Sequence, residues 1–257
     1  MKFYKLHGAG NDFIFLAGSK TIPKEKIVQF CDRNFGIGAD GVIIITKLRR
    51  HYDFRMKYFN SDGSEADFCA NGGRCAVRLA HTLNFFKGNK CTFIAGDGEH
   101  FAEILSDGNI KLQMKRPEGY AKGLKFKKAA GEFFFLNTGV EHTVGFFENI
   151  SELDVEKLGR EIRNDARYSK GTNVNFVQKA DERTLKIRTY ERGVEGETRA
   201  CGTGITAAGY LDMMISDDFR ARKVFTKDGI QLIVSLEKEK LFLSGPAELV
   251  FEGKISH

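Results

Sequence analysis

Two segments of this 257-residue chain match each other in order and spacing, and this duplication constrains the fold more than any other feature. When Cys69 is aligned with Cys201, further identical residues fall into register: Gly72 with Gly204, Ala76 with Ala208, and Leu79 with Leu211. Beyond them, "CTFIAGDGEHFAEI" faces "KVFTKDGIQLIVSL", and "NIKLQM" faces "EKLFLS". Several matches in one order indicate a duplicated structural unit.

The duplication predicts an α/β chain, of the α+β kind, with two similar lobes. Runs such as "GVIIIT" and "KIRTYE" have the character of strands, and Asp-Gly pairs mark tight turns between strands. In each lobe we expect a sheet wrapped around a helix that begins near its cysteine. The join between the lobes is expected near residues 115–123.

Two further helices are predicted outside the repeated cysteine segments. The first covers residues 23–36, because Pro23 suits a first helical turn and Gly36 can end a helix. Its apolar face carries Ile27, Phe30 and Cys31. The second covers residues 151–165, with Ser151 as the expected N-cap.

The charge balance is that of an ordinary globular protein. The net charge is +6, and the one basic cluster, at Lys122, Lys125, Lys127 and Lys128, has no aromatic RNA-binding motif beside it. We therefore expect neither a nucleic-acid partner nor a membrane partner. The N-terminus lacks the apolar region of a signal peptide, and five scattered cysteines argue against a disulfide framework. These features predict a cytoplasmic protein.

Cys69 and Cys201 stand apart from the other cysteines. Each precedes small residues at the point where a helix is expected to begin. The N–H groups and partial positive charge of a helix N-terminus favour a thiolate and can hold a carboxylate. Cys75, in contrast, lies on the apolar stripe of its helix, and Cys31 and Cys91 also suit the core.

Other uses of the cysteine pair are less well supported. Cys69 and Cys75 are too far apart for a zinc knuckle, and Cys201 has no close cysteine or histidine, so we expect no metal. The chain has no phosphate-binding loop of the Walker type, and "GAG" at 8–10 lacks the third glycine of a dinucleotide fingerprint. A redox pair remains open, although it leaves the polar residues nearby without a role.

Two thiols on opposite sides of a bound carbon can invert a stereocentre. The thiolate takes a proton from one face and the thiol delivers one to the other, and a thiol pKa of about 8.5 in free solution can be tuned toward neutral pH. Two helix N-termini aimed at the adjacent carboxylate would stabilise the carbanion. No lysine has a recognisable pyridoxal-phosphate setting, so the pattern favours catalysis without a cofactor.

The whole chain resembles the diaminopimelate epimerases, cofactor-independent enzymes of lysine and peptidoglycan precursor synthesis. The resemblance rests on "FYKLHGAGNDFI", "RNFGIGADGVII", "FNSDGSEADFCANGGRC", "GTNVNFVQ", "ERGVEGETRACGTG" and "GPAELVFEGKI". It implies homodimers and two α/β lobes, each a barrel-like, mostly antiparallel sheet around a central helix. The active site would lie in the cleft between the lobes. We place the first lobe at residues 1–116, with 246–257 returning to it, and the second at 117–245.

The same resemblance implies roles for individual residues. Cys69 and Cys201 match the paired acid–base cysteines. The backbone donors to the reacting carboxylate match Ala70, Asn71, Gly202 and Thr203. The side chains that fix the substrate match Asn11, Asn60, Asn173 and Arg192. Glu191 matches the carboxylate beside the reacting amino group, and His142 matches a histidine near the thiols; both are expected to tune pKa values. On their own, the first two asparagines equally suit turns, Arg192 a surface ion pair, and His142 a core position.

Three departures from the family pattern concern the substrate more than the reaction. The motif around the first thiol reads Cys-Ala-Asn-Gly-Gly-Arg-Cys instead of Cys-Gly-Asn-Gly-Ala-Arg-Cys. Val140 and Glu141 replace Asn-Pro, so an asparagine that helps hold the far end of the substrate is missing, and Gly41 replaces a glutamine found in some members. We expect interconversion of LL- and meso-diaminopimelate. The alternatives are a racemase of another amino acid, such as histidine or a lanthionine-like diacid, and a non-catalytic ligand-binding or thiol-redox protein on the same fold.

Overall fold

The structure is a computed structural model that describes residues 1–18, 21–127 and 129–255. It divides into two compact units, Met1–Gln113 with Gly245–His257 and Met114–Ser244. Within the described residues there are four α-helices, and most neighbouring strands are antiparallel. The predicted fold class, two similar α+β units, is confirmed.

The N-terminal unit is one sheet with two helices, α1 (Lys24–Cys31) and α2 (Ala70–Thr82). Its strands are β1 (Lys2–Gly8), β2 (Asn11–Ala17), β3 (Gly41–Lys47), β4 (Phe54–Asn60), β5 (Glu65–Ala66), β6 (Lys90–Ala95), β7 (Gly98–Ile104), β8 (Ile110–Met114) and β18 (Glu248–Lys254). They pair in the order β18-β1-β2-β3-β4-β6-β7-β8, with β5 added to β4. The pairs β2–β3 and β4–β6 are parallel.

The C-terminal unit has the same plan, with helices α3 (Val155–Arg163) and α4 (Gly202–Ser216). Its strands are β9 (Glu118–Leu124), β10 (Glu132–Asn137), β11 (Glu141–Phe147), β12 (Asn173–Lys179), β13 (Thr184–Glu191), β14 (Gly196–Thr198), β15 (Arg222–Phe225), β16 (Gln231–Glu237) and β17 (Lys240–Gly245). They pair in the order β9-β10-β11-β12-β13-β15-β16-β17, with β14 added to β13.

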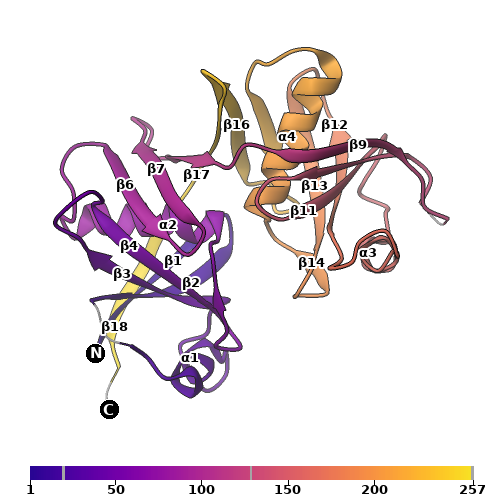
Figure 1. Ribbon diagram of the computed structural model, residues 1–257. Coiled ribbons are helices and arrows are strands. Elements are labelled where there is room, and N and C mark those ends of the chain that lie inside the picture. Colours follow the sequence, from indigo (N-terminus) through magenta and orange to yellow (C-terminus); the bar gives the residue numbers. More distant parts are fainter. Residues whose placement is uncertain (19–20, 128, 256–257) are drawn as a thin grey trace. The chain divides into compact units, whose positions relative to one another are not determined.

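The two strand orders correspond strand for strand. The parallel pairs β11–β12 and β13–β15 match β2–β3 and β4–β6, so the predicted duplication extends to the pairing pattern of the whole sheet. One strand breaks the chain order. β18 follows β17 in sequence but pairs with β1, which brings the first and last strands side by side (Figure 1).

Each central helix is held by an apolar face. α2 packs on β1 to β4, β7 and β18, and α4 packs on β11, β12, β13, β15 and β16 (Figure 1). Cys75 and Leu79 of α2 are almost fully buried, as are Ala208 and Leu211 of α4. Residues three and four apart share a helix face, so this spacing places the apolar side chains on the sheet. The prediction that Cys75 is a core residue is confirmed.

The two shorter helices begin or end at other residues than the sequence predicts. α1 ends at Cys31, before Gly36, because the Asp32 carboxylate accepts from the N–H groups of Asn34 (2.8 Å) and Phe35 (2.7 Å) and turns the chain away. α3 is capped by Asp154, which accepts from Lys157 N at 3.0 Å. Ser151 is therefore not the N-cap.

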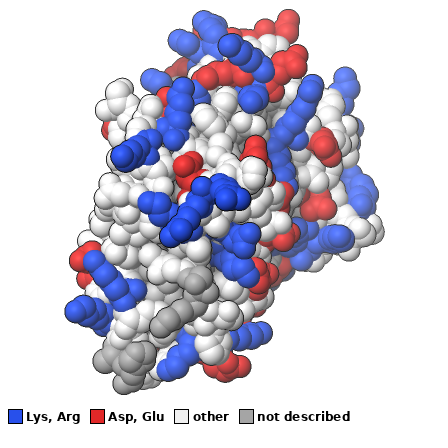
Figure 2. Space-filling model, turned by 60° about the vertical axis from the view of Figure 1, so that its left-hand side comes forward, with Lys and Arg blue, Asp and Glu red and all other residues white. Residues whose placement is uncertain are grey.

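The surface charge is dispersed. Figure 2 shows Lys and Arg side chains scattered over one face with Asp and Glu between them. Of the predicted basic cluster, Lys122, Lys125 and Lys127 are described, and Lys128 lies outside the described residues. Among the helices of the described ranges, none combines the length and the apolar character needed to cross a membrane.

Candidate active site

α2 and α4 both begin at the residue that follows a cysteine. Cys69 (φ −139°, ψ 120°) and Cys201 (φ −110°, ψ 107°) are the N-cap residues, with extended backbones. Their carbonyl oxygens accept the first helical hydrogen bonds, from Gly73 N at 2.7 Å and from Ile205 N at 2.9 Å. The predicted position of both thiols at helix starts is confirmed. Each thiol therefore lies at the end of a helix where N–H groups have no intrahelical partner.

Glycine in the first turn brings both helices close to their sheets. A Cβ atom at Gly72 would lie 2.6 Å from Ile43 Cδ1, and one at Gly204 would lie 2.2 Å from Asn175 Oδ1. A larger residue at position 204 would press on the hydrogen-bonded amide of Asn175, and one at position 72 would have to move the end of the Ile43 side chain. The duplicated glycines are explained by this close packing.

The N-terminal half-site, defined as Asn11, Asn60, Cys69, Ala70 and Asn71, is organised around one amide. Asn11 Oδ1 lies 3.7 Å from Cys69 Sγ, within reach of the thiol proton, and accepts from Asn71 Nδ2 at 3.2 Å. Asn11 Nδ2 donates to Asp40 Oδ2 at 2.6 Å, which orients the amide. The carbonyl oxygen of Asn11 is thereby held toward the thiol.

A cluster of ion pairs holds the Asp40 carboxylate that orients the Asn11 amide. Arg33 donates to Asp12 Oδ1 at 2.7 Å and to Asp40 Oδ1 at 2.8 Å, and Lys5 also pairs with Asp12. Burial raises the pKa of Asp12, but the bonds from Arg33 and Lys5 outweigh it and hold that pKa at about 2. Asp12 therefore stays ionised at neutral pH, and Arg33 connects it to Asp40, the carboxylate that keeps Asn11 in place.

Arg74 supports this half-site through Asn71, and it was not singled out from the sequence. Its side chain is fully buried and donates from Nη2 to Asn71 Oδ1 at 2.9 Å. Its Nε and Nη1 atoms find no hydrogen-bond partner within the described part of the chain. Burial lowers its pKa, because desolvation disfavours the cation. In the sequence Arg74 shares one side of its helix with Asn71 and Arg78, so the helical spacing carried no signal of this burial.

Asn60 lies at the edge of the half-site. Its side chain donates to Ser64 Oγ at 3.1 Å, in the turn between β4 and β5. It faces Gly41 across the β3–β4 pair. A Cβ atom at Gly41 would lie 2.4 Å from the carbonyl oxygen of Phe59, so this backbone has no room for a side chain there. The glycine at position 41 is required by the approach of the two strands.

The C-terminal half-site, defined as His142, Asn173, Glu191, Arg192, Cys201, Gly202 and Thr203, lies at one end of β11 to β13 and at the start of α4. Cys201 Sγ lies 3.4 Å from Thr203 Oγ1. The Thr203 carbonyl accepts from Thr138 Oγ1 at 3.0 Å. Cys201 is buried, whereas Cys69 is partly exposed.

His142 is a neutral, fully buried imidazole. Asn175 Nδ2 lies 3.0 Å from its Nδ1, and Thr189 Oγ1 donates to Asn175 Oδ1 at 3.1 Å. Asn175 Nδ2 also donates to the carbonyl oxygen of Thr143 at 3.5 Å, and because a carbonyl only accepts, the amide nitrogen faces the ring and donates to Nδ1. The proton of the neutral imidazole is then on Nε2. Burial, and to a lesser extent the charge of Arg192, lower the pKa of His142 to about 3.

Asn173, Glu191 and Arg192 form the outer part of this half-site. The backbone N–H of Arg192 donates to Asn173 Oδ1 at 2.8 Å, and Thr198 Oγ1 donates to Glu191 Oε2 at 2.9 Å. Asn173 lies beside His142 in the parallel β11–β12 pair. The guanidinium of Arg192 pairs with Glu141 Oε2 at 2.9 Å.

Asn175 is a second residue that was not singled out from the sequence. It lies two positions after Asn173 on β12, so both side chains point to the same face of the strand. A buried amide there would have been predictable from the alternation in "GTNVNFVQ", where the asparagines are separated by one apolar residue. It is fully buried and connects β12, β11 and β13.

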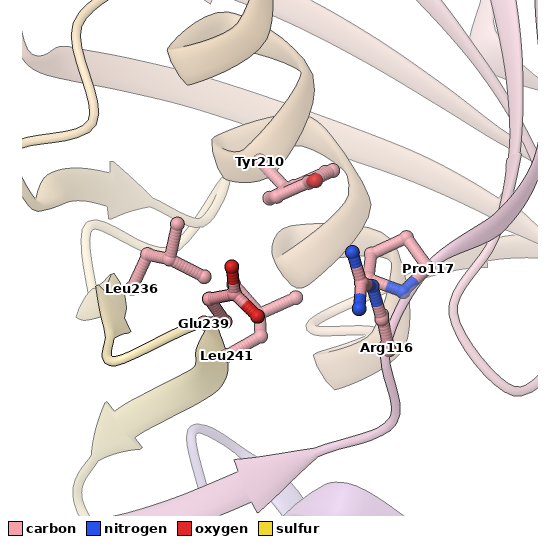
Figure 3. A pocket seen from close by; sticks show the side chains of 6 residues that line it. All are labelled: Arg116, Pro117, Tyr210, Leu236, Glu239 and Leu241. Carbon is pink, nitrogen blue, oxygen red and sulfur yellow. The ribbon is translucent and has the colours of Figure 1, made fainter.

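A small pocket elsewhere on the C-terminal unit involves other residues. The side chains of Arg116, Pro117, Tyr210, Leu236, Glu239 and Leu241 line it (Figure 3). None of them belongs to either half-site. Among the described residues, no group of three or more His, Cys, Asp or Glu side chains is arranged to hold a metal ion.

The sequence of this chain matches one family model and is similar to curated proteins of the same name. The model of the family described as diaminopimelate epimerase matches residues 3–119 and 134–250, one stretch in each half of the chain. The chain is 43% identical to the diaminopimelate epimerase of Flavobacterium psychrophilum, over 99% of this chain and 100% of the relative. It is 39% identical to that of Aquifex aeolicus, over 100% of this chain and 98% of the relative.

Comparison with solved structures extends the likeness of fold to distant proteins. A phenazine biosynthesis protein of the PhzF family from Bacillus anthracis superposes with a TM-score of 0.78 at 14% identity, covering 100% of this chain and 99% of that one. A probable proline racemase from Agrobacterium radiobacter superposes with a TM-score of 0.74 at 12% identity, covering 99% and 92%. At these identities the likeness concerns the fold alone.

Proposed function

The chain belongs to the diaminopimelate epimerase family, and on that premise we propose that it is an isomerase that interconverts LL- and meso-diaminopimelate for lysine and peptidoglycan precursor synthesis. The observation that carries the proposal is the repeated helix start, with a cysteine as the N-cap residue of α2 and of α4. The proposed chemistry needs no cofactor, because the thiols exchange the proton and the helix N-termini stabilise the charge.

In the proposed reaction, Cys69 and Cys201 act on the two faces of one substrate α-carbon. One thiolate removes the α-proton while the other thiol donates its own proton to the opposite face, so the configuration inverts and the charges balance. The carbanion formed between these transfers is delocalised onto the α-carboxylate. Backbone N–H groups of Ala70 and Asn71 in α2, and of Gly202 and Thr203 in α4, are the proposed donors to that carboxylate.

The remaining polar residues orient the thiols and the substrate. We assign Asn11 to the Cys69 thiol, since its oxygen lies 3.7 Å from the sulfur. His142 is neutral near pH 7, so its proposed role beside Cys201 is that of an N–H donor and not of a cation. Glu191 is assigned to the reacting ammonium, and Asn60, Asn173 and Arg192 to the rest of the substrate.

The assembly and the compartment are part of the same proposal. We propose a cytoplasmic homodimer that binds a small amino-acid substrate and neither nucleic acid nor membranes. Its lobes are residues 1–116 with 246–257, and residues 117–245. The two compact units, Met1–Gln113 with Gly245–His257 and Met114–Ser244, support these boundaries. On the face drawn in Figure 2 the charges of both signs are mixed, which supports the proposal that nucleic acid is not a partner.

Isotope exchange tests the proposed function. The purified protein, dialysed without added cofactor, is incubated with LL-diaminopimelate in deuterated water. Deuterium is expected at the α-carbon together with the meso isomer. A panel with histidine and lanthionine tests the alternative racemases, and faster exchange with either would replace the proposed substrate. Absence of exchange with every substrate would leave a binding or redox protein on this fold.

A further inference from the structure

The inference concerns the ion pair between Glu141 and Arg192, and it rests on the proposed function. Glu141 is the first residue of β11, and Arg192 directly follows β13. Glu141 Oε2 lies 2.9 Å from Arg192 Nη1. We propose that Glu141 is a specificity-determining residue: its carboxylate binds the distal ammonium of the substrate, beside Arg192, which the proposed function already assigns to the substrate.

The pair lies next to the proposed catalytic residues of the C-terminal half-site. Glu141 immediately precedes His142, and Arg192 immediately follows Glu191. The backbone N–H of Arg192 is held by Asn173 Oδ1 at 2.8 Å, and Asn173 lies beside His142 in the sheet. The ion pair thus lies beside residues of the half-site that contains Cys201. This position suits the binding of the far end of a substrate whose near end reacts at the thiol.

The hydrogen bonds of Arg192 leave part of its guanidinium for a ligand. Within the described residues, the side-chain bonds of Arg192 are all made by Nη1: to Glu141 at 2.9 Å and to the carbonyl oxygens of Lys170 (3.2 Å) and Gly171 (3.2 Å). The Nε and Nη2 edge can receive a carboxylate in the two-point geometry that arginine favours. The side chains of Arg192 and Glu141 are 26% and 30% exposed, so a ligand can reach both.

The charges of the pair match the far end of diaminopimelate. That end is itself an α-amino acid, with an ammonium and a carboxylate on one carbon. A guanidinium alone binds any carboxylate, whereas a guanidinium with a glutamate beside it also binds an ammonium on the same ligand. A far end that carries only a carboxylate would meet the negative charge of Glu141 and lose affinity. Val140 stands where the family pattern has an asparagine and is apolar. Glu141 is therefore the polar side chain that can contact the substrate just before His142.

The test compares two substrates that differ only in the distal amino group. Diaminopimelate carries it and 2-aminopimelate lacks it, while the reacting end is the same. The readout is kcat/KM for α-proton exchange in deuterated water, measured for the wild-type protein and for Glu141→Gln. Glutamine keeps the size of the side chain and removes its charge. Glu132→Gln, an exposed position at the start of β10, is the matched control.

We expect the wild type to prefer diaminopimelate and Glu141→Gln to lose roughly ten-fold or more in kcat/KM for it, since a hydrogen bond between charged groups is lost. Exchange of 2-aminopimelate should stay unchanged or rise, and Glu132→Gln should change neither value. A parallel fall or a parallel rise for both substrates would overturn the inference, because Glu141 would then only position or mask Arg192. Exchange with neither substrate in the wild type would contradict the proposed function and the inference with it.

Discussion

The side-chain amide nitrogen of Asn175 lies 3.0 Å from His142 Nδ1, and this contact selects the tautomer of a fully buried imidazole. Asn175 Nδ2 also donates to the carbonyl oxygen of Thr143 at 3.5 Å, so Asn175 cannot turn around without placing its own oxygen against that oxygen. With a pKa lowered to about 3 by burial and, to a lesser extent, by the charge of Arg192, His142 is neutral near pH 7. It can orient a neighbour but cannot contribute a positive charge to it.

Replacing Asn175 by aspartate should make the protonated form of His142 more favourable. A carboxylate at Nδ1 favours the protonated imidazole, so the pKa of His142 should rise, by one unit or more for an opposite charge in contact. The measurement is an NMR titration of the histidine Cε1–H signals, with His142→Gln identifying the resonance. Activity should fall in the same variant. An unchanged pKa would show that Asn175 does not contact the ring.

The stability of the protein should depend on pH through His142. In the unfolded chain the imidazole binds a proton below its ordinary pKa of about 6.5, whereas in the folded chain it stays neutral down to about 3. The unfolded state therefore binds more protons in this window. The contribution of His142 to the free energy of unfolding is fully present above pH ~6.5 and is lost as the pH drops toward 3, with a slope approaching ~1.4 kcal/mol per pH unit.

Urea unfolding of the wild type and of His142→Gln at several pH values measures that slope. The wild type should lose stability between pH 6.5 and 4.5, and the variant should lose less over the same range. The contribution of Asp12 is lost later, as the pH falls from the ordinary carboxyl value toward about 2, and does not interfere. Two parallel curves would mean that His142 has an ordinary pKa.

The duplicated glycines should differ in their tolerance of a methyl group. In Gly204→Ala the new Cβ would meet the hydrogen-bonded amide of Asn175 at 2.2 Å. In Gly72→Ala it would meet Ile43 Cδ1 at 2.6 Å, the flexible end of an aliphatic side chain. Overpacking costs about 1–3 kcal/mol, against a gain of up to about 1 kcal/mol from the helix propensity of alanine. Gly204→Ala should therefore be the less stable and less active variant, and the reverse order in thermal unfolding would contradict the packing described for α4.

The buried cation of Arg74 should matter to activity more than to stability. Arg74→Met removes an incompletely paired buried charge, so we expect the free energy of unfolding to change by no more than about 1 kcal/mol or to increase. The variant also loses the bond that anchors Asn71 beside Asn11, and kcat/KM should fall by roughly ten-fold, the equivalent of one hydrogen bond.

Arg78→Met, one turn further along α2, is the matched control. Arg78 donates to the carbonyl oxygens of Gly108 and Ala247, and so connects the helix to the ends of the unit. Its loss should lower stability and leave kcat unchanged. If Arg74→Met were instead the less stable of the two and fully active, Arg74 would have a purely structural role.

Much of the fold and of the site could be predicted from repetition in the sequence. Aligning Cys69 with Cys201 was sufficient to place two helix starts, because both N-caps follow from the same local pattern of a cysteine before small residues. The burial of Cys75 followed from helical spacing. These features depend on neighbours along the chain, which the sequence displays directly.

Some of the missed features depend on side-chain hydrogen bonds within a few residues, and others depend on contacts between distant segments. The early end of α1 results from the Asp32 side chain, which competes for backbone N–H groups. Asp154 and Ser151 are only three residues apart and both suit an N-cap, and it is Asp154 that accepts from a backbone N–H of α3. Asn175 and Arg74 gain their roles only once other strands and Asn71 surround them. The contact between Glu141 and Arg192 joins the beginning of β11 to the end of β13, and spacing along the chain carries no signal of it.

The division of labour between the two thiols is tested most directly with a substrate that needs only one proton abstraction. Cys69→Ser and Cys201→Ser should each abolish most epimerisation, because a serine hydroxyl is far too weak an acid to ionise near neutral pH. Each variant should still eliminate the halide from a β-halogenated diaminopimelate of one configuration, and the two variants should prefer opposite configurations. Cys75→Ser should lose stability through its buried hydroxyl and keep the reaction. Elimination of the same configuration by both single variants, or inactivation of folded protein by Cys75→Ser but not by Cys69→Ser, would contradict the assignment of one thiol to each face.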